Sequence, residues 1–150
     1  MTQVEVPEGR RTLLHPGLIA SGATLLIATF VSDYLYWDTL LFQYHNFSGW
    51  LLAGGLVLSL LAAIAFMIDL VRGRIGRIAW LRFAGLAAAA LLGTLNAFVH
   101  SRDAYASVVP EGITLSAIVT VILLIVGIGG GWSLASHRIA PLPQNREFRS

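Results

Sequence analysis

The chain has 150 residues, of which 56% are hydrophobic and 12% are charged, and its formal net charge is +2. Soluble domains carry roughly 25% charged residues, and one small soluble core cannot hide this much apolar surface, so the composition predicts an integral membrane protein. The absence of Cys excludes disulfides, zinc-thiolate sites, iron–sulfur sites and covalent c-type haem. The basic residues are all Arg, and they form no basic face that would bind nucleic acid.

Four apolar segments are long enough to cross the membrane, because about 20 helical residues span about 30 Å of hydrocarbon. The predicted spans lie at about 16–36, 47–71, 79–99 and 113–137. Together they form a transmembrane domain over 15–138, with flexible tails at 1–14 and 139–150. The predicted fold class is therefore all-α, an integral membrane four-helix antiparallel bundle.

The first span begins at Pro16, which suits the first turn of a helix. One stripe of this helix combines small, apolar and polar residues: His15, Gly22, Leu26, Thr29 and Asp33. We expect Asp33 to face the bundle, because a carboxylate facing lipid costs up to a few kcal/mol. Aromatic residues follow, as is typical of a membrane interface: Tyr34, Tyr36 and Trp37.

A short loop over 38–46, which contains His45, is predicted to lead into the second span, and Asp69 lies near the far end of that span. The third span repeats small residues every four positions, a pattern that permits close helix packing in membranes: Gly85, Ala89, Gly93 and Ala97. Asn96 and His100 lie one helical turn apart on its last turns. The fourth span carries a GxxxG pair, Gly127 and Gly131.

The distribution of Arg predicts the orientation. Nine Arg residues lie in the two tails and the region of the second connection, whereas Arg102 alone lies on the other side. The positive-inside rule then places both termini in the cytoplasm. The loops that follow the first and third spans face outward, and the chain is predicted to lie in the bacterial inner membrane as a multi-pass protein.

Polar residues gather at the two ends of the spans and leave the middle apolar. The inner group contains His15, Asp69 and His137, and the outer group contains Asp33, His45, Asn96, His100, Arg102 and Asp103. Polar groups within spans are costly unless they are satisfied, so they mark a candidate site.

One interpretation is a b-type haem, whose iron takes two neutral imidazoles from different helices. His100 is the first candidate ligand of haem iron, with His45 as its partner, and His15 with His137 is a second candidate pair. Arg102 would meet a haem propionate. Asp33, Asn96 and Asp103 would orient the imidazoles by hydrogen bonds, and Asp69 would do so at the inner end.

The alternative is structural. A His at the end of a span often caps carbonyls or lies among lipid headgroups, and Asp33 and Asp69 can pair with Arg within the bundle. A hydrolytic motif is lacking in the sequence. Carriers usually hold polar groups near the midplane, where this sequence is apolar.

The sequence resembles the bacterial membrane family catalogued as domain of unknown function 2231. The likeness covers roughly residues 14–138 and rests on His15-Pro16, Asp33, Asp69 and the segment from Asn96 to Asp103 with Tyr105. Members of this family often accompany periplasmic quinoprotein sugar dehydrogenases or cytochromes. The resemblance therefore implies a redox neighbourhood and carries over no activity.

The leading hypothesis is a redox or anchor subunit that holds b-type haem and links a periplasmic dehydrogenase or cytochrome to quinone. The alternative is a cofactor-free scaffold or interaction subunit of a larger complex, and the third is small-molecule transport. An electron-transfer or non-catalytic subunit fits better than a stand-alone enzyme. Beyond the lipid bilayer, no partner follows from the residues themselves.

Overall fold

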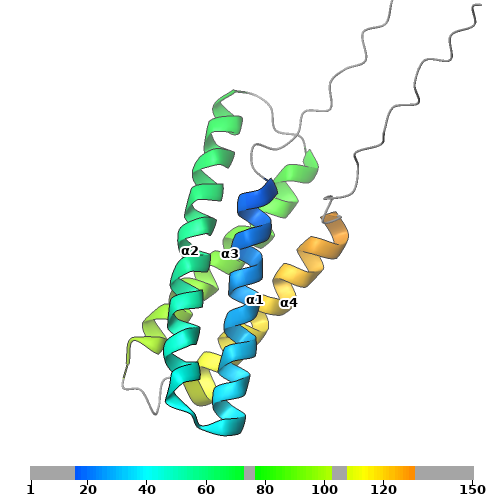
Figure 1. The fold of residues 1–150 in the computed structure, drawn as a ribbon. Coiled ribbons are helices and arrows are strands. Elements are labelled where there is room, and N and C mark those ends of the chain that lie inside the picture. The colour runs from blue at the N-terminus through cyan, green and yellow to red at the C-terminus, as the bar shows by residue number, and fades with distance from the viewer. Residues whose placement is uncertain (1–15, 73–76, 103–107, 131–150) are drawn as a thin grey trace, which may run out of the picture.

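The structure, a computed structural model, describes residues 16–72, 77–102 and 108–130, which form four long helices (Figure 1). These are α1 (Pro16–Thr39), α2 (Phe42–Val71), α3 (Arg77–His100) and α4 (Ile113–Gly130), and a short turn, η1 (Val108–Gly112), leads into α4. In this part of the chain there is no strand, and each helix is long and apolar enough to cross a membrane. The predicted fold class is therefore confirmed. The two tails, His15, Asp103 and His137 lie outside the described residues.

Each helix packs against two neighbours, so the four form a closed ring. α1 contacts α2 and α4, and α3 contacts the same two helices. Figure 1 shows α1 between α2 and α4 with α3 behind them, and the chain reverses direction at every connection. The α1–α2 connection, the end of α3 and the start of α4 therefore lie at one end of the bundle, which we call the turn end.

The middle of the bundle is an apolar core to which all four helices contribute. Its buried members are Ala23, Leu26, Leu52, Ala89, Val119 and Leu123. Close helix contact depends on glycine: a Cβ on Gly55 of α2 would lie 2.8 Å from Leu26 of α1. The small-residue ridge of α3 packs inward as predicted, since Ala89 is buried, a side chain at Gly85 would meet Val126, and one at Gly93 would meet Leu56.

The second helix begins earlier than the sequence analysis indicated. Its polar segment from Gln43 to Asn46 resembled a loop, but α2 begins at Phe42, and only Leu40 and Leu41 connect it to α1. His45 therefore lies on the first turn of a helix, where its position is fixed, instead of in the predicted loop.

The outward faces of the helices are apolar. Large side chains such as Val57, Leu81 and Ile128 are 57%, 80% and 81% exposed. A bilayer accommodates this surface, whereas water would not. The chain is thus built as a multi-pass membrane protein.

Candidate functional site

The structure brings four of the predicted site residues together near the turn end. Asp33 comes from α1, His45 from the first turn of α2, and Asn96 and His100 from the last turns of α3. Asp33 faces the bundle, as expected from the cost of exposing a carboxylate to lipid, and is 0% exposed. Arg102 does not join this group: its Nη1 lies 3.4 Å from Oε2 of Glu111, and both side chains are exposed. Asp69 is buried near the far end of α2.

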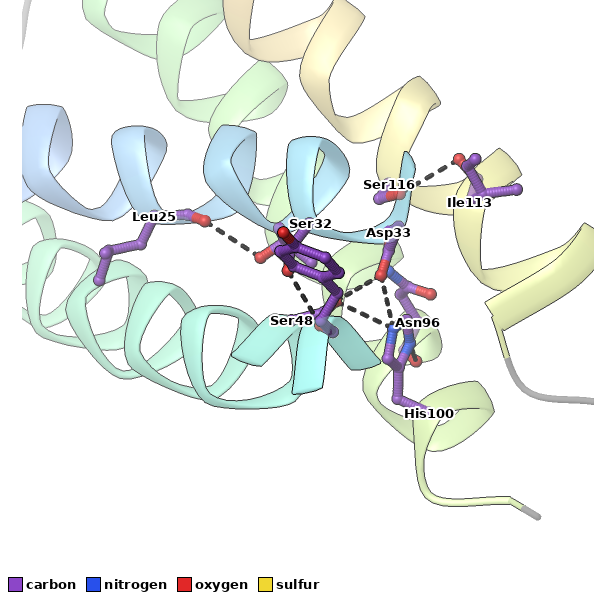
Figure 2. Close-up of polar contacts among 10 residues, drawn as sticks. Leu25, Ser32, Asp33, Ser48, Asn96, His100, Ile113 and Ser116 are labelled. Atoms are coloured by element: carbon purple, nitrogen blue, oxygen red, sulfur yellow. Dashed lines mark hydrogen bonds and ion pairs between the residues drawn. The ribbon is translucent and has the colours of Figure 1, made fainter. Parts of the chain in front are cut away.

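Three side chains from three helices meet at the centre of this site (Figure 2). Nε2 of His100 lies 3.0 Å from Oδ1 of Asp33 and 3.2 Å from Oγ of Ser48. The Ser48 hydroxyl donates a hydrogen bond to the same oxygen of Asp33. Nδ1 of His100 lies 3.1 Å from the backbone carbonyl oxygen of Asn96. Asp33, Ser48, Asn96 and His100 are called the polar cluster below.

The partners of His100 assign its protons. A carbonyl only accepts, so Nδ1 carries a hydrogen and donates it to Asn96. A bare Nε2 lone pair would repel the carboxylate of Asp33, so one proton must lie between them. Asp33 and His100 therefore share a single proton, whether it resides on the imidazole or on the carboxyl group. The pair is well shielded, with side-chain exposures of 0% for Asp33 and 5% for His100.

The presence of Ser, His and Asp in one cluster does not create a catalytic triad. In a triad the serine and the aspartate contact opposite ring nitrogens, so that the imidazole can pass a proton between them. Here Ser48 and Asp33 both lie beside Nε2, and Nδ1 is held by the backbone. Ser48 is also 0% exposed, and its hydroxyl donates to the carboxylate. This geometry does not activate a nucleophile.

The geometry of His100 does not fit an axial ligand of haem. An axial ligand must direct one nitrogen lone pair at the iron and keep the other nitrogen for a hydrogen bond. Both nitrogens of His100 are already engaged by groups of the chain itself. Within the described residues, no group of three or more His, Cys, Asp or Glu side chains is placed to hold a metal ion.

His45 extends the site toward the surface by ring packing. Its ring is parallel to that of His100 to within 5°, with centroids 5.8 Å apart, and it also contacts the rings of Tyr36 and Phe42. Its Nδ1 atom is buried and has no hydrogen-bond partner in the described part of the chain. His45 is therefore held as one member of an aromatic group beside the polar cluster.

Hydrogen bonding around the polar cluster is uneven. Ser32 of α1 donates to the carbonyl of Tyr44 on α2 at 2.9 Å, and Thr29 donates to Leu25 on its own helix. By contrast, Oδ2 of Asp33 and both side-chain polar atoms of Asn96 are buried without a hydrogen-bond partner among the described residues. The side chain of Asn96 lies beside Asp33 in Figure 2.

Sequence reasoning missed Ser48, although a signal was present. Ser48, Leu52 and Gly55 follow at helical spacing, and all three are buried. Because α2 begins at Phe42, Ser48 already lies on the helix, in the stripe that packs against α1. Ser48 can therefore contact Asp33.

A protein-family model described as "Predicted membrane protein (DUF2231)" matches residues 11–142. No curated protein and no solved structure matches the chain.

Proposed function

The chain belongs to the DUF2231 family of predicted membrane proteins, and from this premise we propose that it is a cofactor-free anchor or scaffold subunit. It would work within a larger assembly of the bacterial inner membrane, with a periplasmic dehydrogenase or cytochrome as its partner. The observation that carries this proposal is that both ring nitrogens of His100 are engaged inside the chain. The residue with the most polar neighbours thus serves the fold.

The structural role of the polar cluster has a clear physical basis. Polar groups inside a membrane protein cost several kcal/mol each when they lack partners, so side chains that satisfy one another across helices favour one arrangement. Asp33, Ser48 and His100 join α1, α2 and α3 in this way. A bundle fixed at this end presents a rigid surface, which is what an anchor subunit requires.

The proposal is tested by deleting the gene and measuring where periplasmic dehydrogenase activity is found. Deletion should move the activity from the membrane fraction to the soluble fraction, and the wild-type gene should restore it. His45→Phe should restore it equally, because phenylalanine keeps the ring packing and removes both imidazole nitrogens. If the activity stays membrane-bound after deletion, the anchor role is wrong.

Electron transfer to quinone is the second candidate, favoured by one observation. His45, His100 and Asp33 form a row from the half-buried His45 to the buried pair that shares a proton. Reduction of quinone to quinol takes up two protons, and such a row could deliver them from the surface. In this case His100→Gln would slow quinone reduction by the membrane-bound dehydrogenase at least tenfold and leave the enzyme attached. An anchor alone predicts an unchanged rate.

A further inference from the structure

The connection between α1 and α2 is apolar at its outermost point. Leu40 and Leu41 form the whole connection, and Phe42 begins α2. Their exposed fractions are 64%, 50% and 60%. A turn that projects into water usually consists of Gly, Pro, Asn, Asp or Ser, because these residues suit both the geometry and the solvent.

The backbone of Leu40 adds an independent observation. Its φ is 57°, in the left-handed region, and its N–H donates to the carbonyl of Tyr36 at 2.7 Å. This position after a helix is normally taken by glycine, which adopts it without steric cost. A leucine held there is strained, so the surrounding structure must hold it in this conformation.

The surroundings of the turn indicate which environment it meets. Trp37, Phe47 and Trp50 are exposed on the adjoining turns of α1 and α2, and Asp38 is the one charged residue from position 34 to position 50. Amphipathic aromatic rings are enriched where hydrocarbon meets the headgroups. This surface is also continuous with the apolar outer faces of the two spans.

We propose that Leu40, Leu41 and Phe42 form an interfacial anchor, seated at the boundary between the headgroups and the acyl chains of the bilayer. The occupant of this surface is lipid. The connection on the other side of the turn end differs, because Arg102 and Glu111 are exposed there and need water. Leu40 and Arg102 therefore meet different environments at the turn end.

This placement also sets the depth of the polar cluster. Asp33 precedes Leu40 by seven residues, which is about 10 Å of helix at ~1.5 Å per residue. With Leu40 at the boundary, Asp33 lies inside the hydrocarbon layer, and the side chain of His100 contacts it there. This accounts for a carboxylate and an imidazole that are almost completely covered by protein.

Because the chain has no Cys, single labels can test the anchor. Leu41→Cys and the control Ser101→Cys are labelled with bimane in phosphatidylcholine nanodiscs, and variants with the thermal stability of the parent are compared. Nitroxides on the lipid headgroup or at acyl carbon 5 should quench the label at position 41 at least twofold more than a nitroxide at carbon 12. Iodide should quench it at least threefold less than the label at position 101.

A turn that lies in water would give the opposite quenching pattern. If iodide reaches position 41 as readily as position 101 and the spin-labelled lipids have no effect on it, the turn lies in water. The lipid assignment is then wrong, and the apolar turn belongs to a contact with another protein. Because the nanodiscs contain this chain without any partner, the result does not depend on the proposed function as an anchor subunit of a larger assembly.

Discussion

Nε2 of His100 lies 3.0 Å from Oδ1 of Asp33, although the two residues are 67 positions apart in the chain. This contact joins the end of α3 to α1, and Ser48 brings α2 to the same carboxylate oxygen. Three of the four spans are thereby tied together at the turn end by contacts to one carboxylate oxygen.

The first prediction concerns the strength of this contact. A double-mutant cycle of Asp33→Ala and His100→Ala should give a coupling energy of at least about 1 kcal/mol, because hydrogen bonds between membrane helices reach ~1.7 kcal/mol and removal of one partner from a buried pair is more costly still. The measurement is unfolding in mixed micelles followed by tryptophan fluorescence. The control cycle is Arg102→Ala with Glu111→Ala, an exposed pair that should couple by less than about 1 kcal/mol. Equal coupling in the two cycles would contradict the structural role.

The second prediction isolates Ser48. Ser48→Ala should destabilise the bundle by about 1 kcal/mol, since it removes one of the two hydrogen-bond partners of Oδ1 of the buried Asp33 and leaves only His100. Ser59→Ala is the matched control on the same helix, because the Ser59 hydroxyl donates to the Gly55 carbonyl of its own helix and, among the described residues, to no other helix. Its effect should stay within about 0.5 kcal/mol. A loss at Ser59 as large as that at Ser48 would argue against the cluster.

Close packing of α1 on α2 gives the third prediction. Gly55→Ala should destabilise by about 1–3 kcal/mol, because its Cβ would lie 2.8 Å from the buried Leu26 and 3.3 Å from the carbonyl oxygen of Gly22. Gly49→Ala meets nothing within 4 Å and should be neutral or slightly stabilising. Thermal unfolding in detergent distinguishes the two variants. A neutral Gly55→Ala would show that the helices are further apart.

The fourth prediction is the topology. Nine of the ten Arg residues belong to the side that holds the termini, so the termini should be cytoplasmic. Fusions of alkaline phosphatase after Ser150 should be inactive, and insertions in the segment 102–111 should be active. The reverse pattern would place the turn end in the cytoplasm and remove any contact with a periplasmic partner.

The spans could be predicted from the sequence because their length and hydropathy are local properties. The inward direction of Asp33 could be predicted because a carboxylate within a span is costly where it faces lipid. The start of α2 could not be predicted, because polar residues from Gln43 to Asn46 are tolerated on a helix whose first turn lies at the membrane interface.

The hydrogen-bond partners of His100 could not be predicted from the sequence for another reason. Serine is common in membrane helices, and which serine meets Asp33 depends on how α2 is rotated against α1. That rotation is set by the contact of Gly22 with Gly55, which neither glycine reveals by itself. From the sequence, an imidazole at the end of a span suggested a ligand of haem iron. Its hydrogen-bond partners became known only from the way the helices pack in the structure.

The ring nitrogens of His100 bind groups of the chain itself and are not available to haem iron. The optical spectrum of the purified protein tests this most directly. The chain is produced in cells supplied with a haem precursor and purified in mild detergent. The account predicts no Soret band, and no α band after reduction with dithionite. A Soret band with a sharp α band on reduction, lost in His100→Ala and kept in Ser101→Ala, would contradict it.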